Sequence, residues 1–96
     1  MAERMGARRP FSSKNVGDVP HRSGVYNLIN RAGDVVYTGS AAAGRLQDRL
    51  KEHLRSGDIP GATQFQIRPT RSTVEARKVE GELIKRNQPR HNVLGK

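Results

Sequence analysis

Two short runs of the chain, residues 24–30 and 34–40, are rich in β-branched and aromatic residues. Such runs, bounded by turn residues, are typical of β-strands. Arg31, Ala32 and Gly33 lie between them and supply the glycine that a short turn needs. The pattern therefore predicts a β-hairpin in which the two strands pair directly.

The next apolar pattern has the period of a helix. Leu46, Leu50 and Leu54 recur every four residues, which places them on one face of a helix. Gly57 follows, and glycine is favoured in the left-handed conformation that ends many helices. We therefore predict an amphipathic helix over residues 42–56.

The last third of the chain predicts one more strand and one more helix. Residues 64–68 alternate polar and apolar side chains, as a half-buried strand does. Ser72 and Glu75 match a capping box, so a second helix is predicted over residues 74–87, before Pro89. The elements follow the order strand, strand, helix, strand, helix.

Residues 1–22 show no apolar periodicity and mix arginine, serine, glycine and proline. Segments of this composition are typically mobile. We therefore predict a flexible basic N-terminal arm over residues 1–22 and a single domain over residues 23–96. With 96 residues, of which 33% are hydrophobic, the chain has material for one small core only.

Charge narrows the range of partners. The net charge of +9 favours a polyanion, either nucleic acid or an anionic membrane surface, and charge alone does not decide between them. The absence of cysteine excludes disulfide-linked secreted scaffolds and zinc fingers. No apolar run approaches the ~18 residues of a membrane span, and no secretory signal opens the chain. We therefore expect a cytoplasmic protein without a membrane segment.

Glu80 is the first residue that ordinary packing does not explain. With about 100° per residue, Glu80 falls inside the apolar stripe of the second helix, which contains Ala76, Val79, Leu83 and Ile84. A carboxylate on the packed side of a helix needs a cation, hydrogen-bond donors or a metal ion, since burial of an unpaired charge is costly. An ion pair with a nearby arginine and a metal site are both open.

Two further pairs of residues admit a functional interpretation. Arg49 and His53 lie one helical turn apart and can grip a single anion, although such pairs are also common on solvated helix faces. Tyr26 and Tyr37, the only tyrosines, are separated by an odd number of positions. In a hairpin with an even-numbered loop and no bulge, this spacing puts both rings on one face, either as an ordinary cross-strand pair or in a shared site.

Ser40 and Asn92 complete the set of candidates. Ser40 is favoured as a helix N-cap, and Asn92 as a turn residue after Pro89. Each candidate thus has a structural explanation of its own. In a chain of 96 residues, however, two tyrosines, an arginine and histidine pair, an inward glutamate and a terminal asparagine occur together, and this combination favours a functional site.

The order and spacing of these residues resemble a GIY-YIG nuclease domain, the catalytic module of excision-repair nucleases, phage homing endonucleases and some restriction enzymes. The resemblance covers about residues 20–93. The matching segments are Gly24-Val25-Tyr26, Tyr37-Thr38-Gly39-Ser40, Leu46 to His53, Glu75 to Ile84, and Pro89-Arg90-His91-Asn92. Val25 and Thr38 replace the two isoleucines of the family name, and both are β-branched and suit strands. The stretch between Ser40 and Arg49 is about two residues longer than is typical.

The resemblance implies an α+β fold, with a small three-stranded antiparallel β-sheet flanked by helices in β-β-α-β-α order. It also implies a Mg²⁺-dependent DNA endonuclease, with Mn²⁺ as a substitute, which hydrolyses phosphodiester bonds by a one-metal mechanism with tyrosine-assisted activation of water. The catalytic residues implied by the resemblance are Tyr26, Tyr37, Arg49, His53, Glu80 and Asn92. Among them Glu80 would be the metal ligand, Arg49 would hold the phosphate, and Tyr26 would be the base.

DNA, single- or double-stranded, is the expected partner, and a protein partner for targeting is compatible with the absence of a second DNA-selecting domain. The residues expected to contact nucleic acid outside the catalytic set are Ser40, Arg45, Arg8, Arg9 and Lys14. The alternative to an enzyme is a non-catalytic basic module that binds DNA or structured RNA on the same fold. That alternative needs only the positive charge and leaves Glu80 unexplained.

Overall fold

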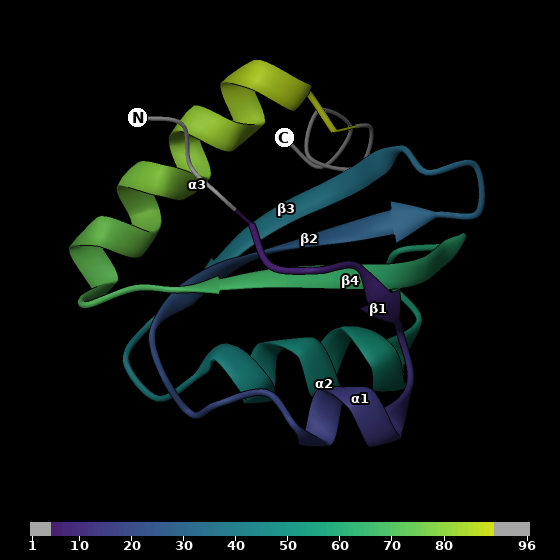
Figure 1. The fold of residues 1–96 in the computed structure, drawn as a ribbon, viewed down its shortest axis with the longest axis horizontal. Coiled ribbons are helices and arrows are strands. Elements are labelled where there is room, and N and C mark those ends of the chain that lie inside the picture. Colours follow the sequence, from purple (N-terminus) through teal and green to yellow (C-terminus); the bar gives the residue numbers. More distant parts are fainter. Residues whose placement is uncertain (1–4, 90–96) are drawn as a thin grey trace.

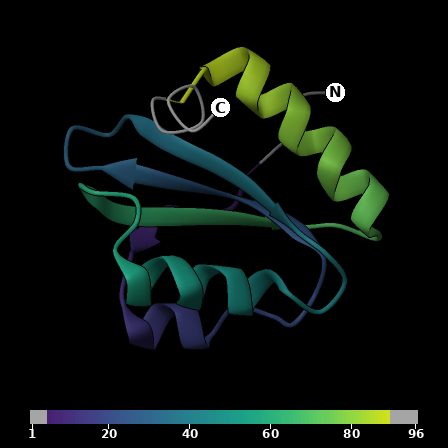
Figure 2. The same ribbon diagram turned by 180° about the vertical axis from the view of Figure 1, so that it is seen from behind.

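A computed structural model of the chain describes residues 5–89, which form three layers (Figure 1). Helix α3 covers one face of a β-sheet, and helices α1 and α2 cover the other (Figures 1 and 2). In chain order the elements are β1 (Arg9–Pro10), α1 (Ser13–Gly17), β2 (Gly24–Asn30), β3 (Val35–Ala41), α2 (Leu46–Ser56), β4 (Ala62–Pro69) and α3 (Thr73–Asn87).

The sheet is antiparallel and has the strand order β1-β4-β2-β3. The three predicted strands and the α+β class are confirmed, and the two-residue β1 adds a fourth, outer strand. Strand β3 forms the opposite edge. Within the hairpin, Tyr26 pairs with Gly39 and Leu28 pairs with Tyr37, while the register shifts only nearer the turn, between Leu28 and Ile29.

Side chains of β2 alternate between two core clusters, because successive residues of a strand point to opposite faces of the sheet. On the face covered by α3, Val25 packs with three apolar residues of that helix. On the other face, Tyr26 and Leu28 pack with apolar residues of α1, α2 and β4. The buried residues of this larger cluster are Val16, Val19, Tyr26, Leu28, Val36, Ala41, Leu46, Leu50 and Phe65.

Helix α2 begins at Leu46 rather than at the predicted residue 42, because β3 continues to Ala41 and a turn with Gly44 at φ 79° follows. Ser40 is therefore a strand residue and not the N-cap of this helix. Gly57 does end α2 in the left-handed conformation, with φ 64°. In α3 the predicted cap is confirmed, since the Ser72 hydroxyl accepts a hydrogen bond from the Glu75 amide.

The prediction of a separate flexible arm over residues 1–22 is wrong for the part of this segment that the structure describes. Strand β1 pairs with β4, and α1 places Val16 in the core with no exposed surface. Val19 is also buried, and the Gln47 side chain of α2 donates hydrogen bonds to the carbonyls of Gly17 and Val19. Two isolated valines have no periodicity, so the sequence pattern did not reveal that they contribute to the core.

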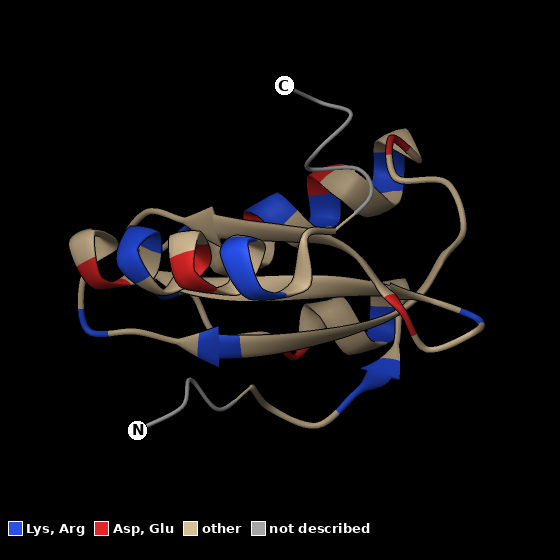
Figure 3. Ribbon diagram, turned by 90° about the horizontal axis from the view of Figure 1, so that it is seen from above, with Lys and Arg blue, Asp and Glu red and all other residues tan. Residues whose placement is uncertain are grey.

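Charged residues lie mainly on the helices, where basic and acidic positions are interleaved, and in the loops that join the elements (Figure 3). The positive charge is therefore not gathered into a single run along one element. Among residues 5–89, no helix is long and apolar enough to cross a membrane.

The packing of α1 can be tested by removing two methyl groups from Val16. We expect Val16→Ala to lower the free energy of unfolding by about 2 kcal/mol, because the side chain is fully buried and its removal leaves a cavity. The matched control is Val74→Ala, at a valine that is 78% exposed, for which a change within about 0.5 kcal/mol is expected. Urea denaturation measures both, and equal effects would contradict the packing of α1 into the core.

Candidate active site

The two tyrosines lie on the same face of the sheet, as the sequence predicted. Tyr26 of β2 is opposite Gly39, and Tyr37 of β3 is opposite Leu28, so the two rings are diagonal neighbours with centroids 6.1 Å apart. The predicted condition, an even-numbered loop without a bulge, is not met. The pair of Ile29 and Val35 encloses an odd-numbered loop, and the register shift between Leu28 and Ile29 adds one residue on β3, so the two departures cancel and both rings lie on one face.

Gly39 has no side chain where the Tyr26 ring crosses β3. A Cβ atom at this position would overlap the hydroxyl oxygen of Tyr26 and come within 2.5 Å of its Cζ. Only glycine therefore lets the phenol extend over the neighbouring strand. Since β3 is an edge strand, this direction carries the Tyr26 hydroxyl away from the centre of the sheet and toward its open side.

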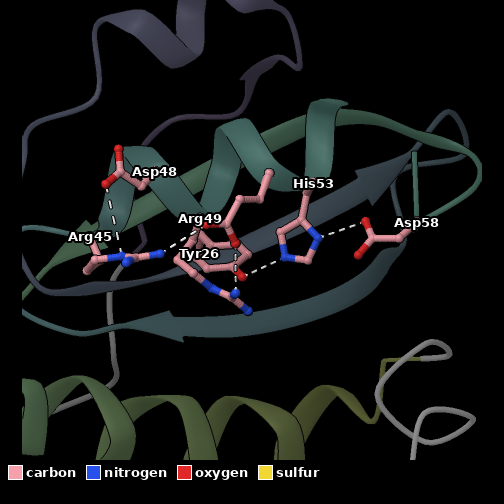
Figure 4. A network of polar contacts seen from close by, with 7 residues as sticks. Tyr26, Arg45, Asp48, Arg49, His53 and Asp58 are labelled. Carbon is pink, nitrogen blue, oxygen red and sulfur yellow. Dashed lines mark hydrogen bonds and ion pairs between the residues drawn. The ribbon is translucent and has the colours of Figure 1, made fainter. Parts of the chain in front are cut away.

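The Tyr26 hydroxyl meets two side chains of α2 (Figure 4). Its oxygen is 2.7 Å from Nε2 of His53, and it is also hydrogen-bonded to the guanidinium of Arg49. The spacing of Arg49 and His53 along the helix, which the sequence placed on one flank, thus brings both to one oxygen atom. The His53 ring also packs against Tyr37, with centroids 5.1 Å apart.

The second nitrogen of His53 is occupied as well. Nδ1 lies 2.9 Å from Oδ1 of Asp58, the residue after the glycine that ends α2. Asp58 was not predicted as a site residue. The left-handed backbone of Gly57 turns the chain at this point, and the Asp58 carboxylate comes back beside the ring (Figure 4).

Arg49 is shared between Tyr26 and a carboxylate of its own helix. One of its guanidinium nitrogens is 3.0 Å from Glu52, which also pairs with Arg45 at 3.0 Å. Arg45 additionally lies 4.0 Å from Asp48. Arg49, the candidate for phosphate binding, is thus already paired with a carboxylate. Glu52 was not singled out in the sequence, although its spacing of three residues from Arg49 is that of a helical ion pair.

The electrostatic surroundings keep Tyr26 protonated. Burial, the charge of Tyr37 and the charge of Glu80 raise the pKa of Tyr26 well above its ordinary value of 10.0, and Arg49 only partly opposes them. Burial disfavours the charged form of Arg49, but Tyr26, Glu52 and Tyr37 together raise its pKa above the ordinary value. The site therefore holds a neutral phenol beside a permanent cation.

Glu80 approaches from the other side of the sheet. It is half-buried on α3, and its carboxylate accepts a hydrogen bond of 2.8 Å from the Ser40 hydroxyl of β3. Ser40 pairs with Val25, whose side chain faces α3. The negative charge of Glu80 nevertheless contributes to the raised pKa of Tyr26, so it acts across the β3 edge on the hydroxyl.

The oxygen donors around Glu80 fit one kind of metal ion. Within residues 5–89, no three His, Cys, Asp or Glu side chains gather in a way that could hold a metal. A zinc site of nitrogen and sulfur ligands is therefore not available in this part of the chain. A single carboxylate suits Mg²⁺, which keeps several waters and takes further oxygens from a bound phosphate.

The other residues predicted to contact nucleic acid do not lie near the Tyr26 hydroxyl. Arg9 belongs to β1, at the sheet edge opposite β3, and pairs with Asp18 at 3.4 Å. Arg8 donates a hydrogen bond to the Gly33 carbonyl, and Lys14 is exposed on α1. Asn92 lies outside the described residues.

A cavity of about 470 Å³ elsewhere on the molecule contains none of the candidate catalytic residues. It is lined by Ser13 of α1 and by Lys51, Leu54 and Arg55 of α2. On α2 these residues lie on a different flank from Arg49 and His53. The candidate site is therefore defined by converging side chains at a sheet edge rather than by this cavity.

The chain resembles a described protein family and several curated proteins. Residues 6–90 match the family described as "Domain of unknown function (DUF7508)". The UvrABC system protein C of Sphingopyxis alaskensis is 36% identical over 87 residues, and that of Nitrosomonas eutropha is 33% identical over 84 residues. These alignments cover 82% and 79% of the chain but only 13% and 14% of the relatives.

Solved structures of a UvrC domain share the fold. The GIY-YIG N-terminal endonuclease domain of UvrC from Thermotoga maritima, bound to its catalytic divalent cation, magnesium, superposes with a TM-score of 0.68 and 29% identity, covering 81% of this chain and 91% of that one. A point mutant of the same domain, also bound to its catalytic divalent cation, gives the same TM-score. The chain thus belongs to the family described as domain of unknown function DUF7508 and has the α+β fold of the GIY-YIG endonuclease domain of UvrC.

Proposed function

We propose that this chain is a Mg²⁺-dependent DNA endonuclease that hydrolyses phosphodiester bonds with a single metal ion. One observation carries the proposal: Arg49 and His53 converge on the hydroxyl of Tyr26, with the charge of Glu80 acting on the same atom from the opposite layer. A fold built only to bind nucleic acid has no need to bring a phenol, a guanidinium, an imidazole and a carboxylate together at one edge. The UvrC domains support the same assignment.

In this proposal each residue of the site has a separate role. Tyr26 takes a proton from the attacking water, and Tyr37 orients that water from the neighbouring strand. Arg49 leaves Glu52 to bind the scissile phosphate and stabilises the negative charge that develops on it. His53 carries the proton of Tyr26. Glu80, held by Ser40, is the protein ligand of Mg²⁺, or of Mn²⁺ as a substitute.

When bound, the metal ion supplies Lewis acidity to the phosphate oxygens and charge neutralisation. Asn92 is proposed to brace the substrate from the segment after α3.

The proposed substrate is DNA, and the proposed compartment is the cytoplasm. Arg45, Arg8, Arg9 and Lys14 contribute salt-dependent contacts to phosphates outside the cleaved position. The chain spans only about an eighth of its UvrC relatives, and a protein partner that selects the DNA structure is part of the proposal.

Removal of the Glu80 carboxylate tests the metal site. We expect Glu80→Gln to reduce Mg²⁺-dependent cleavage of plasmid and single-stranded DNA at least about 100-fold, because loss of even an outer partner of a metal ligand costs about 10- to 100-fold. Glu82→Gln, an exposed glutamate of the same helix, is the matched control and should cleave normally. EDTA should abolish cleavage by both, whereas wild-type rates in Glu80→Gln would contradict the assignment.

Arg49→Lys tests the geometry of phosphate binding, because lysine keeps the charge but loses the planar fork. We expect kcat to fall roughly 100-fold, the scale seen when one donor to a developing negative charge is removed. Arg55→Lys makes the same replacement on another flank of α2 and should leave kcat unchanged. Equal rates for the two variants would show that Arg49 contributes charge alone.

The raised pKa of Tyr26 can be measured directly in Tyr37→Phe, which leaves Tyr26 as the only tyrosine and contains no tryptophan. Because the folded pKa is raised, the neutral phenol stabilises the fold below pH 10, and this contribution is lost as the pH rises toward the folded pKa. Near-ultraviolet absorbance should report phenolate only well above pH 10 in the folded variant. In urea-unfolded protein it should appear at about pH 10, and the same midpoint in both states would contradict burial of the hydroxyl.

A further inference from the structure

His53 is a nearly buried side chain with both ring nitrogens engaged. It is 7% exposed, Nε2 lies 2.7 Å from the Tyr26 hydroxyl, and Nδ1 lies 2.9 Å from the Asp58 carboxylate. The rings of Tyr26 and Tyr37 pack against it, with centroids 5.5 Å and 5.1 Å away. The ring therefore has little freedom to turn, and its two partners decide where its proton resides.

The partners allow one neutral tautomer. An ionised carboxylate can only accept hydrogen bonds, so Nδ1 must carry the proton. Nε2 is then an unprotonated acceptor aimed at Tyr26, whose hydroxyl donates to it. In the other tautomer, the Nδ1 lone pair would face a carboxylate oxygen at 2.9 Å with no proton between them.

Asp58 is ionised when it makes this contact. Partial burial acts to raise its pKa, but the hydrogen bond and charge of His53, with hydrogen bonds from Ser56 and its own backbone, outweigh burial and lower the pKa below 3.8. Among the residues labelled in Figure 4, the charged groups next to the His53 ring are Asp58 from the loop after α2 and Arg49 from the helix itself. The rings of Tyr26 and Tyr37 face it from the sheet.

We propose that Asp58 is a positioning residue of the nuclease site, which fixes His53 in the Nδ1-protonated form so that Nε2 can receive the proton of Tyr26. This inference rests on the proposed nuclease function. The O–H bond of Tyr26 breaks and an N–H bond forms at Nε2, which leaves a phenolate and an imidazolium flanked by the Asp58 carboxylate. The phenolate then takes a proton from the attacking water while the water oxygen bonds to phosphorus and the P–O bond to the leaving deoxyribose oxygen breaks. The leaving oxygen takes up a proton from solvent, and the imidazolium releases its proton to solvent.

The backbone around Gly57 makes this arrangement possible. The Gly57 amide donates to the carbonyl of His53, and the left-handed turn directs the chain back along the last turn of α2. The Asp58 amide donates to the Ser56 hydroxyl at 3.3 Å. Asp58 is five residues beyond His53, so only the end of the helix, and not helical periodicity, brings the two side chains together.

Nitrogen-15 NMR of the histidine ring tests the assignment without any activity measurement. In wild type we expect the His53 signals of a protonated Nδ1 and an unprotonated Nε2, identified by their loss in His53→Gln. Asp58→Ala should shift the ring toward the Nε2-protonated form. Asp34→Ala, which removes an exposed aspartate from the hairpin turn, is the charge-matched control and should leave the His53 signals unchanged.

Kinetics test the consequence for catalysis. Because Asp58 acts through His53 and does not contact DNA in this proposal, Asp58→Ala should lower kcat about 10- to 100-fold, the cost typical of losing a histidine's orienting partner, with KM unchanged. Asp58→Asn keeps the side-chain shape without the charge and should also lower kcat. Asp34→Ala should match wild type, and thermal unfolding should show that all variants are folded.

The outcomes separate the two proposals. An unchanged His53 tautomer in Asp58→Ala, or wild-type kcat in that variant, would overturn the role of Asp58 while leaving the nuclease proposal intact. A wild-type protein that cleaves no DNA with Mg²⁺ would overturn the nuclease proposal, and with it the catalytic role of Asp58. A tautomer shift together with a loss of kcat supports the positioning role.

Discussion

The burial of one phenol against an edge strand determines how the rest of the site is arranged. The Tyr26 ring has no exposed surface, yet its hydroxyl must find polar partners because an unpaired buried donor is costly. Helix α2 provides those partners through Arg49 and His53. The same helix packs its leucines on the sheet, so the packing that stabilises the fold also sets the distance between the phenol and its partners.

The site is assembled from residues of both faces of the sheet near the edge strand β3. Tyr26, Tyr37, Arg49 and His53 belong to the face covered by α2, whereas Glu80 belongs to α3 on the other face. An interior strand would separate these groups by a closed layer of backbone. At an edge strand, one side remains open to a ligand, and groups from both faces can act on it together. The glycine at position 39 extends this opening, because no side chain stands between the phenol and the edge.

Much of this arrangement could be predicted from the sequence, where a periodic pattern or a local signal was present. The spacing of Leu46, Leu50 and Leu54 gave α2, and Ser72 gave the start of α3. The placement of Tyr26 and Tyr37 on one face was predicted from their odd separation, although the hairpin departs from the assumed one by an odd-numbered loop and a bulge that cancel each other. The inward direction of Glu80 followed from the apolar stripe of its helix, although its hydrogen bond to Ser40 crosses 40 residues and has no local signal.

The parts that could not be predicted depend on single tertiary contacts. Val16 and Val19 enter the core without any repeat in their neighbourhood. Asp58 reaches His53 only after a left-handed turn has been made, and polar residues after a helix are too common to single it out. Glu52 could be found by its spacing from Arg49, but nothing in the sequence distinguishes it from other surface ion pairs.

The position of the register shift in the β2–β3 hairpin affects where the length of the hairpin can change. It lies on the turn side of Leu28, so the extra residue is absorbed before the pairing reaches Tyr26 and Gly39. Because β2 is also paired with β4, a one-residue slip beyond that point would exchange the faces of the β3 side chains and separate Tyr37 and Gly39 from the Tyr26 ring. The bulge therefore lets the hairpin tip differ in length while the register at Tyr26 and Gly39 is kept, whereas a one-residue change of length between Tyr37 and Gly39 would move one of these two residues to the other face.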